Sequence, residues 1–583
     1  MSKSGFTTAF SRKQRIAAAC CRGILLIGTV VLLLAVTGPA ASRAPVRAPR
    51  AMVVTTEPRA TQVGVDILKG GGNAVDAAVA VGFALAVTHP SAGNLGGGGF
   101  MLFRPGAGGE TVMIDYREMA PLAASRNMYL DGDGNAMKDA STVGYRASGV
   151  PGTVAGLALA LERFGTMKLA DVITPAIMLA REGVELSFHE SESMSAAREL
   201  LGRFPESKRI FLRDGSIYAQ GERFRQPELA GSLDAIARNG AREFYEGSLA
   251  RRIATEMGSH GGLITLEDLK NYKVVVRRPM RGNYRDCEIY SSPPPSSGGT
   301  ALIEMLNILE HYPLERYGQG SSRSLHLIAE AMKRAYADRA EFLGDADFVR
   351  VPLAGLISRR YAQDRRAAID PFLASDASQA GHGNPLPFEA EQTTHYSVVD
   401  KDGNAVANTY TLNGGYGSGV TIDGTGILMN NEMDDFSAKP GAPNDAGLIH
   451  GEANAIAPGK RPLSSMTPTI VLKEGKLFLV LGSPGGPTII NTVLQTILNV
   501  VDYRMTIQEA VDAPRIHHQW MPDRLVMERV GFAEDVREAL RARGHTVDLR
   551  RSIGDCQAIM IEPNTGIRLG AADPRNDGRA AGY

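Results

Sequence analysis

Hydroxyl and imidazole side chains fall together on one face of a predicted β-hairpin over residues 393–413. Two strand-like runs flank an Asp-Gly-Asn turn, which pairs Lys401 with Ala405 and Thr393 with Asn413. Residues of one parity share a face of a pleated strand, so this face carries Thr393, His395, Ser397, Thr409, Thr411 and Asn413. Such hydroxyls could attack a carbonyl carbon if a base takes the proton. The pattern is also typical of an ordinary half-exposed hairpin, and a one-residue shift would exchange its faces.

A second segment offers a place for the negative charge that such an attack creates. Residues 477–481 form a short apolar strand that ends in Gly482-Ser483-Pro484-Gly485-Gly486, and a helix over about 488–503 follows Pro487. Backbone N–H groups at the positive end of a helix can hold an oxyanion, although glycines also simply turn corners. A third segment, Arg461-Pro462-Leu463-Ser464-Ser465, sets two hydroxyls beside a proline.

The elements that must position these groups divide at Gln392. Upstream, helical spacing of apolar residues covers 60–68, 74–87, 154–164 and 322–342. The stretch from Ala374 to Gln392 has no periodicity and contains glycines and prolines, which favours an exposed connector. Short alternating strands and Asp-Gly and Glu-Gly turns follow. The glycine-rich run 94–100 lacks the Lys-Ser/Thr of a phosphate loop and indicates tight backbone packing near a core strand.

The composition predicts a large buried core and a neutral protein. The chain has 583 residues, 44% of them apolar, and its 63 basic residues equal its 63 acidic residues. A zero net charge gives no sign of a nucleic-acid partner. Two cysteines, Cys20 and Cys21, lie near the N-terminus, whereas Cys287 and Cys556 could form a disulfide or remain buried thiols. We find no metal-ligand spacing and predict neither a metal nor a cofactor.

The N-terminus has the pattern of a secretory signal. Basic residues precede an apolar run over 24–36, and small residues follow at Gly38, Ala40 and Ala41. We predict a signal peptide over residues 1–40 and a periplasmic or secreted protein. The apolar run is shorter than the roughly 20 residues of a membrane span, so an uncleaved anchor is the less favoured alternative.

Five motifs, in the expected order and spread over most of the chain after the signal, resemble those of gamma-glutamyltranspeptidases. They are Asp115-Tyr116-Arg117-Glu118-Met119-Ala120-Pro121, Thr393-Thr394-His395-Tyr396-Ser397, Asn430-Asn431-Glu432-Met433-Asp434-Asp435-Phe436, Arg461-Pro462-Leu463-Ser464-Ser465-Met466 and Gly482-Ser483-Pro484-Gly485-Gly486.

The resemblance implies an α+β fold of the N-terminal-nucleophile hydrolase type, a four-layer αββα sandwich. It also implies that the precursor cuts itself before Thr393. The large subunit would then cover residues 41–392 and the small catalytic subunit residues 393–583, and the two would form a heterodimer.

Such a cut would create a nucleophile and its base on one residue. A threonine hydroxyl is a poor nucleophile without a base. The free α-amino group of an N-terminal residue has a pKa of about 7.7–8.0 in peptides, near the pH at which a general base works best. No Ser-His-Asp triad is then needed, and we expect His395 to be structural.

Matched position by position, the resemblance assigns a role to each candidate residue. Thr411 would hydrogen-bond Thr393, and Gly485 and Gly486 would supply the oxyanion N–H groups. The α-carboxylate of a glutamyl group would be bound by Arg117, Ser464 and Ser465. Its α-ammonium would be surrounded by Asn413, Glu432 and Asp435.

The implied activity is transfer of the gamma-glutamyl group from glutathione and related amides to water, amino acids or dipeptides. One alternative is an acylase of the same fold with another acyl preference. An acyl group without the ammonium would leave Asn413, Glu432 and Asp435 unpaired, which argues against it. A second alternative is an inactive secreted scaffold, which the presence of both Thr393 and Thr411 opposes.

A covering loop is predicted over about 438–451, because the segment is rich in turn residues and lacks periodicity. The segment lies just after Asp435 and before Ser464 in the sequence. Bacterial relatives with this loop often carry an aromatic residue where this chain has Ala446, so we expect weaker closure here and strong competition from hydrolysis.

Overall fold

The computed structural model describes residues 42–385 and 396–583, and its contacts separate Met1–Ala44 from a second unit, Pro45–Tyr583. The fold described here is that of the second unit. The predicted signal peptide, and the predicted residues Thr393 and His395, lie outside the described residues. Among the helices of the described ranges, none is long and apolar enough to cross a membrane.

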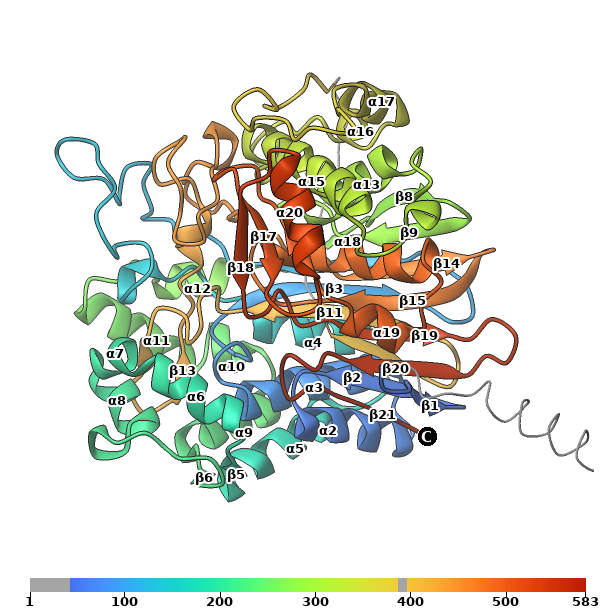
Figure 1. The fold of residues 1–583 in the computed structure, drawn as a ribbon. Helices are drawn as coiled ribbons and strands as arrows, with labels where there is room; N and C mark the ends of the chain where they lie inside the picture. The colour runs from blue at the N-terminus through green and yellow to red at the C-terminus, as the bar shows by residue number, and fades with distance from the viewer. Residues whose placement is uncertain (1–41, 386–395) are drawn as a thin grey trace, which may run out of the picture. The chain divides into compact units, whose positions relative to one another are not determined.

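Two seven-stranded antiparallel sheets form the centre of this unit (Figure 1). The first, the β11 sheet, has the order β21 (Arg579–Gly582), β2 (Met52–Thr55), β10 (Ser397–Val399), β11 (Ala405–Thr411), β3 (Gly98–Arg104), β4 (Val112–Tyr116) and β7 (Val275–Arg277). The second, the β15 sheet, has the order β1 (Val46–Ala48), β20 (Arg568–Ala572), β19 (Gln557–Ile561), β15 (Lys476–Gly482), β14 (Thr469–Lys473), β9 (Cys287–Ser291) and β8 (Met280–Tyr284). Each sheet mixes strands from before Gln392 with strands from after it.

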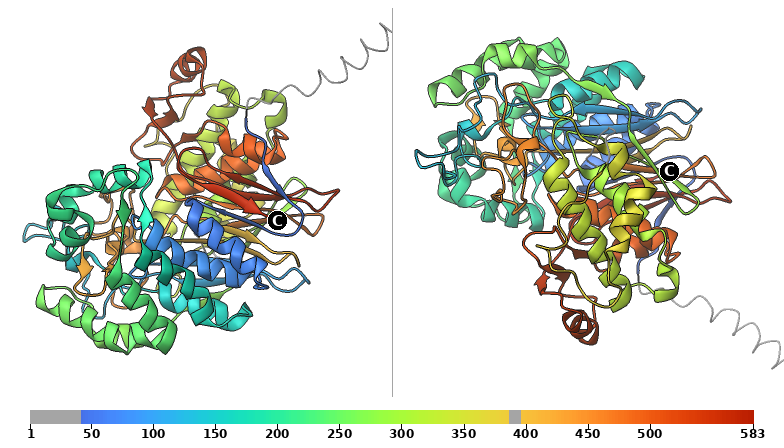
Figure 2. Two further views of the ribbon diagram at one scale, coloured as in Figure 1. Left: turned by 90° about the horizontal axis from the view of Figure 1, so that it is seen from below. Right: turned by 90° about the horizontal axis from the view of Figure 1, so that it is seen from above.

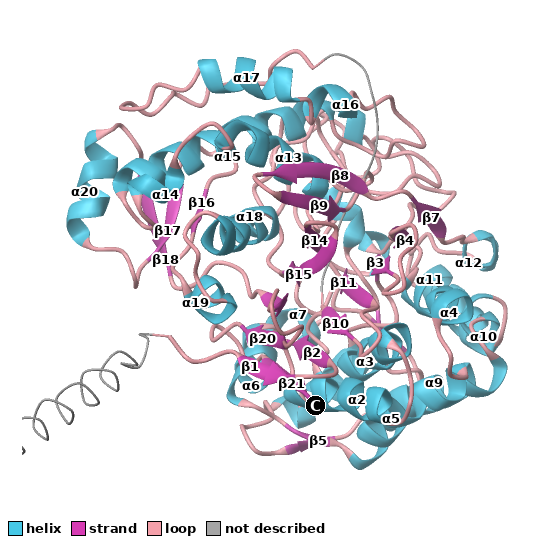
Figure 3. Ribbon diagram, turned by 90° about the vertical axis from the view of Figure 1, so that its right-hand side faces the viewer, coloured by secondary structure: helices cyan, strands magenta, loops and turns pink. Residues whose placement is uncertain are grey.

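Helices cover the outer face of each sheet and complete four layers (Figures 2 and 3). Residues of the β11 sheet share one hydrophobic core with the helices that pack on it, α2 (Pro58–Lys69), α3 (Ala74–Thr88), α4 (Thr153–Phe164), α5 (Leu169–Glu182) and α9 (Pro227–Asn239). Residues of the β15 sheet share a second hydrophobic core with α13 (Gly298–Leu309), α15 (Ser322–Phe342), α18 (Thr488–Val501) and α19 (Ile507–Asp512). A third core, with Phe100, Leu102 and Val480, lies between the sheets. The predicted αββα sandwich is confirmed.

Shorter elements flank these layers. The helices are α6 (Phe188–Ala196), α7 (Arg198–Gly202), α8 (Pro205–Phe211), α10 (Arg242–Tyr245), α11 (Ser248–Ser259), α12 (Leu266–Asn271), α14 (Leu314–Tyr317), α16 (Leu353–Leu356), α17 (Arg359–Ala367) and α20 (Glu534–Ala542). Small sheets pair β5 (Val184–Glu185) with β6 (Arg223–Phe224), β12 (Thr421–Ile422) with β13 (Ile427–Leu428), and β17 (Leu525–Glu528) with both β16 (Ile516–His517) and β18 (Val547–Arg550). Single 3-10 turns are η1 (Tyr145–Ala147), η2 (Arg213–Gly215), η3 (Glu432–Asp435) and η4 (Glu452–Asn454).

Local patterns place the long helices correctly. Helix α3 is apolar all round, and every one of its residues is buried between the β11 sheet and the other helices. It begins where the Asn73 side chain accepts from the backbone N–H groups of Val75 and Asp76, while Asp76 accepts from the Asn73 N–H. Helix α15 has the bounds that its spacing predicts, and the segment from Ala374 to residue 385 contains neither helix nor strand.

The predicted hairpin forms with β10 and β11, but its register differs from the prediction by two residues. Val399 pairs with Ala405, where Lys401 was expected. The loop is wider because the Asp400 carboxylate accepts from the backbone N–H groups of Asp402 and Asn404 at 2.9 and 3.0 Å.

A shift of two residues preserves the predicted faces. Val398 and Val406 pack toward the helical layer, whereas Val399 and Ala405 pack toward the β15 sheet. Both faces of this central hairpin are therefore buried, so the interpretation as a half-exposed hairpin is wrong.

The two cysteines of the folded unit are free and buried, so they do not form a disulfide. Cys287 begins β9 and Cys556 precedes β19, and two strands of the β15 sheet lie between them. Three strand spacings of about 4.8 Å exceed the reach of a disulfide. Burial is the main cause that raises the thiol pKa, to about 12 for Cys287 and about 11 for Cys556.

We expect neither of these thiols to react with a thiol reagent at pH 8 in the native protein, because the thiolate is the reactive form. Both should react at once in denaturant. The reaction is measured with an aromatic disulfide reagent, which releases an absorbing aromatic thiol for each cysteine that reacts. Native and denatured samples of the protein without residues 1–40 are compared. A fast-reacting native thiol would contradict the buried, high-pKa assignment.

Candidate active site

A cavity of about 680 Å³ lies between the end of β11, the turn η3 and the turn that precedes α18. Eight of the predicted site residues line it: Thr411, Asn413, Glu432, Asp435, Ser464, Ser465, Gly485 and Gly486. They come from segments far apart in the sequence, and only the packing of the two sheets brings them together. Ala446 and Leu448 of the predicted covering loop line the same cavity.

Thr411 and Asn413 lie where β11 ends. Thr411 is the last residue of β11, an interior strand of its sheet, and pairs with Gly98 of β3. Its hydroxyl oxygen accepts the backbone N–H of Asn413 at 2.8 Å, and no group among the described residues accepts the hydrogen of this hydroxyl. Asn413 has a φ of 73°, which turns the chain away from the strand, and its side chain donates to the Asn431 carbonyl at 3.1 Å.

The turn between β15 and α18 requires glycine. Gly485 and Gly486 have φ values of 132° and 54°. A Cβ on Gly485 would lie 2.5 Å from the Thr488 hydroxyl oxygen. Within the described chain, neither backbone N–H donates to another protein group, and α18 begins directly afterwards at Thr488. The turn therefore offers two unused donors at the positive end of a helix.

Arg117 does not line the cavity but lies fully buried behind it. Its guanidinium contacts the Glu432 carboxylate and bonds the Asp435 carboxylate at 2.6 Å. Its Nε donates to the Pro462 carbonyl at 3.2 Å. The resemblance assigned Arg117 to the substrate carboxylate and the two acids to the ammonium, whereas in this structure the three side chains pair with one another.

The acids around Arg117 outnumber it. Burial lowers the pKa of Arg117, but the carboxylates of Glu432 and Asp435 outweigh burial and raise it. Burial raises the pKa of Glu118 to about 7 despite the attraction of Arg117, and it raises the pKa of Glu432 strongly. The three carboxyl groups of Glu118, Glu432 and Asp435 thus surround one guanidinium, and burial favours the protonated form of Glu118 and Glu432.

The loop with Ser464 and Ser465 is anchored by the segment before α13. The backbone N–H of Ser464 donates to the Pro295 carbonyl, and Ser297 donates its N–H and its hydroxyl to the Ser464 carbonyl, each at 2.8 Å. Both serines are nearly fully buried, and Ser465 accepts from Arg339 of α15 at 3.2 Å.

Sequence reasoning missed Arg339. Helix α15 was predicted as an ordinary amphipathic helix with charges between its apolar residues. A signal was present, since the last two turns carry Arg334, Asp338 and Arg339 on a helix that is buried on nearly all sides. Charged residues on a buried helix must have polar partners, and that requirement points to a nearby site. His89, Asp555 and Asn576 also line the cavity without having been predicted.

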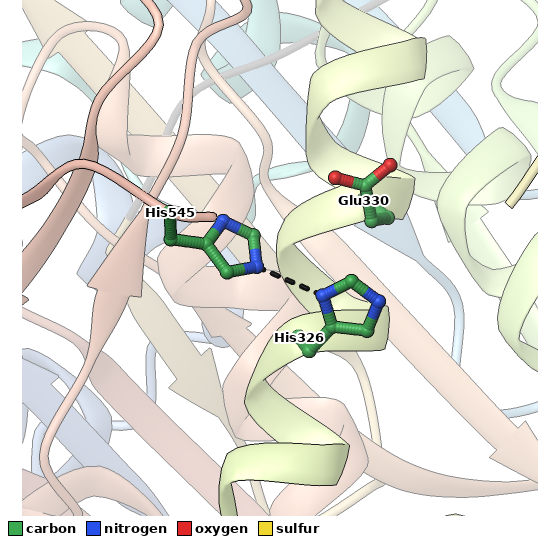
Figure 4. A group of neighbouring side chains, drawn as sticks. All are labelled: His326, Glu330 and His545. Carbon is green, nitrogen blue, oxygen red and sulfur yellow. Dashed lines mark hydrogen bonds between the residues drawn. The ribbon is translucent and has the colours of Figure 1, made fainter. Parts of the chain in front are cut away.

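One group of side chains has the types of a metal site (Figure 4). His326 and Glu330 lie four residues apart on α15, a spacing that the sequence analysis overlooked, and His545 lies beside them. The His326 Nε2–H bonds a backbone carbonyl at 2.8 Å, which leaves Nδ1 against His545 Nε2, also at 2.8 Å.

The donor set of this group does not suit a cation. Both Glu330 oxygens already accept hydrogen bonds from Ser375, and they pair with Lys333 and Arg334 at 3.3 and 2.6 Å. A dication would meet these two buried positive charges. Burial lowers the pKa of both histidines, to about 3 for His545, so the group is a neutral imidazole pair beside a compensated carboxylate.

The predicted nucleophile Thr393 lies outside the described residues, but the chain that follows it begins beside the cavity. Tyr396 lines a small cavity of about 50 Å³ that shares Thr409, Tyr410 and Pro484 with the large one. The Tyr396 hydroxyl donates to the Ala78 carbonyl of α3 at 2.6 Å, which fixes the start of the segment.

Comparisons with known proteins agree with this geometry. The family described as Gamma-glutamyltranspeptidase matches residues 60–583. A glutathione hydrolase proenzyme of Escherichia coli is 53% identical over 541 residues, which cover 92% of this chain and 93% of the relative. An acylase ACY 1 proenzyme of a Pseudomonas species is 41% identical and covers 92% of this chain and 94% of its own length.

The fold has solved counterparts. The crystal structure of a cephalosporin acylase from Bacillus halodurans superposes with a TM-score of 0.83 at 29% identity, covering 94% of this chain and 98% of that one. The two sheets with their helical layers, the shared cavity and the family match across residues 60–583 point to one conclusion. This chain belongs to the gamma-glutamyltranspeptidase family.

Proposed function

We propose that the protein is a gamma-glutamyltransferase and glutathione hydrolase. The observation that carries the proposal is that eight residues, assigned beforehand to nucleophile support, oxyanion binding and head-group binding, line one cavity. Glutathione assayed with and without a dipeptide acceptor tests it. Release of glutamate without acceptor, and of a gamma-glutamyl dipeptide with it, is the expected result.

The nucleophile in this proposal is Thr393, exposed when the precursor cuts itself after Gln392. In the mature enzyme, continuation of β10 in its register with β11 would bring Thr393 opposite Thr411. The Thr411 hydroxyl, which already accepts the Asn413 N–H, would donate to Thr393. The new α-amino group would take the proton of the Thr393 hydroxyl as it attacks.

The reaction then proceeds through an acyl-enzyme. The Thr393 oxygen attacks the γ-carbonyl carbon, and the developing oxyanion is held by the N–H groups of Gly485 and Gly486. Collapse expels the amine, which receives the proton from the α-amino group. Water or an acceptor amine attacks the ester in the second half, with the same group as base, and restores the free hydroxyl.

Recognition of the glutamyl head is proposed to exchange one set of ion pairs for another. The substrate ammonium would replace part of the contact that Arg117 makes with Glu432 and Asp435. The substrate carboxylate would face Ser464 and Ser465. Because both charged ends are needed to offset the opened pairs, a substrate with one end missing should bind poorly.

The acylase alternative draws support from the 41% identical relative and from the cephalosporin acylase fold. The hydrolase relative is more similar, and the acid pair in the cavity has no role for an acyl group without an ammonium. The proposed location is the periplasm or the exterior, from the signal pattern of residues 1–40. The acceptors are proposed to be amino acids and dipeptides.

The segment 438–451 is proposed to act as a lid. It contains neither helix nor strand, and Ala446 at its tip is exposed while lining the cavity. The Asp445 N–H bonds the Asp434 carboxylate at 3.2 Å, and Gln519 donates to the Gly447 carbonyl at 3.0 Å. Leu448 and His450 are buried near the end of the segment, so opening is expected at the tip around Ala446.

Ala446→Tyr should raise the ratio of transfer to hydrolysis about three- to tenfold at fixed acceptor concentration. An aromatic ring adds roughly 100 Å² of apolar contact, worth at most about 2.5 kcal/mol, and excludes water from the acyl-enzyme. Product analysis by chromatography measures the ratio. Ala442→Tyr, on the same loop but absent from the cavity lining, is the control. An equal ratio in all three proteins would remove the lid from the mechanism.

A further inference from the structure

Arg339 is a buried arginine without a carboxylate partner. Its exposed fraction is 2%, and its Nε and Nη2 donate to the hydroxyl oxygens of Ser297 and Ser465 at 2.8 and 3.2 Å. Among the described residues, no acid lies within ion-pair distance of it. The other fully buried arginines each have one: Arg117 with Glu432, Arg334 with Glu330, and Arg515 with Asp573.

A buried cation without a counter-ion is costly to keep. Burial lowers the pKa of Arg339 to about 10, and Tyr336 and Asp435 oppose this lowering only in part. The side chain therefore remains protonated at neutral pH. The charge lies directly behind Ser465, whose hydroxyl borders the cavity, so an anion in the cavity would supply the missing counter-charge.

Hydrogen-bond direction supports the same conclusion. A hydroxyl has a single hydrogen to donate. The Ser465 oxygen accepts from Arg339, and the Ser464 oxygen accepts from the Met466 N–H at 3.3 Å. Both serines line the cavity, so each is left to turn its hydrogen toward an acceptor there. Two inward O–H donors over a buried cation form a receptor for a carboxylate.

We infer that Arg339 is a positioning residue for the α-carboxylate of the gamma-glutamyl donor, which it orients through Ser465 and by its charge. The inference rests on the proposed function. In this structure Arg117 pairs with Glu432 and Asp435, and these pairs must open before its guanidinium can contact the carboxylate. Arg339 has no such pair to open, because no acid among the described residues lies within ion-pair distance of it.

The test compares two anilide substrates of one enzyme, gamma-glutamyl-p-nitroanilide and 4-aminobutyryl-p-nitroanilide, which lacks only the α-carboxylate. Arg339→Met keeps most of the side-chain volume without the charge. Its KM for the glutamyl anilide should rise about 10- to 100-fold, the effect of losing a charge-assisted hydrogen bond. Its kcat/KM for the aminobutyryl anilide should change less than threefold. Arg339→Lys should recover part of the loss.

Arg334→Met is the matched control, because it removes another buried arginine of α15, one that pairs with Glu330 and does not line the cavity. We expect its KM for the glutamyl anilide to change less than threefold. Self-cleavage on denaturing gels and the melting temperature report on folding of each variant. If Arg339→Met fails to fold, Arg339→Lys combined with Ser465→Ala carries the test, and the two effects should then be less than additive.

Three outcomes would overturn the inference. The first is an unchanged KM in a folded Arg339→Met enzyme. The second is an equal loss on both anilides, which would indicate a merely structural role. The third is strict additivity of Arg339→Lys with Ser465→Ala. A wild-type enzyme that turns over neither anilide nor glutathione would instead overturn the proposed function itself.

Discussion

Thr393→Ala should remain a single uncut chain and should lose gamma-glutamyl turnover by about 10⁴-fold or more, the scale of removing a catalytic nucleophile. The hydroxyl of Thr393 is proposed to attack both the preceding peptide bond and the substrate. Denaturing gels follow the cut, and release of p-nitroaniline follows turnover. N-terminal sequencing of the smaller wild-type band should begin with Thr393.

Two further variants serve as controls for the nucleophile assignment. Thr394→Ala changes the neighbouring hydroxyl and should still be cut. Thr393→Ser keeps a hydroxyl and should be cut and remain active at a reduced rate. Normal processing of Thr393→Ala, or a cut at another peptide bond, would contradict the nucleophile assignment.

Asp435→Ala and Arg117→Ala should cut turnover of gamma-glutamyl anilide by about 30- to 5,000-fold while self-cleavage continues. Removal of one partner from a buried, hydrogen-bonded charge pair costs about 2–5 kcal/mol. Asp435 is the cleaner site, since its side chain is 16% exposed and it borders the cavity. Arg117 is fully buried among Glu118, Glu432 and Asp435, so its loss should also lower the melting temperature.

Glutaryl-p-nitroanilide distinguishes a loss of ammonium recognition from a general loss of catalytic activity in a variant. It keeps the α-carboxylate position and lacks the ammonium, so the wild-type enzyme should turn it over far more slowly than the glutamyl compound. Asp435→Ala should reduce the ratio of glutamyl-anilide turnover to glutaryl-anilide turnover. Equal wild-type rates on the two anilides would contradict the head-group assignment and favour the acylase alternative.

Local sequence rules predicted the parts of the fold that short-range chemistry decides. Helix α3 follows from an unbroken apolar run with an asparagine cap, and the turn before α18 follows from glycines that must adopt positive φ. The order of strands in each sheet joins residues hundreds of positions apart, and periodicity contains no such information. The predicted hairpin register was wrong because the Asp400 carboxylate accepts hydrogen bonds from two backbone N–H groups of its own loop.

The candidate site was predicted mainly by resemblance, and the structure adds what resemblance does not contain. Motif matching gives each residue one role, so it set Arg117 against the substrate and did not foresee its pairing with Glu432 and Asp435. It also passed over Arg339, which belongs to no chemical motif and is notable only for where it is buried. Burial depends on tertiary packing, which single-sequence patterns do not specify.

Cleavage before Thr393 would leave neither product with a complete sheet. Strands β10 and β11 of the later segment lie between β2 and β3 of the earlier one, and β14 lies against β9. The backbone hydrogen bonds between these strand pairs remain when the peptide bond is cut, so they continue to hold the two products together. The two products should therefore melt in one cooperative transition and should not exchange partners between molecules. Segments 41–392 and 393–583 made separately would each expose unpaired strand edges, and activity should be recovered only when both fold together.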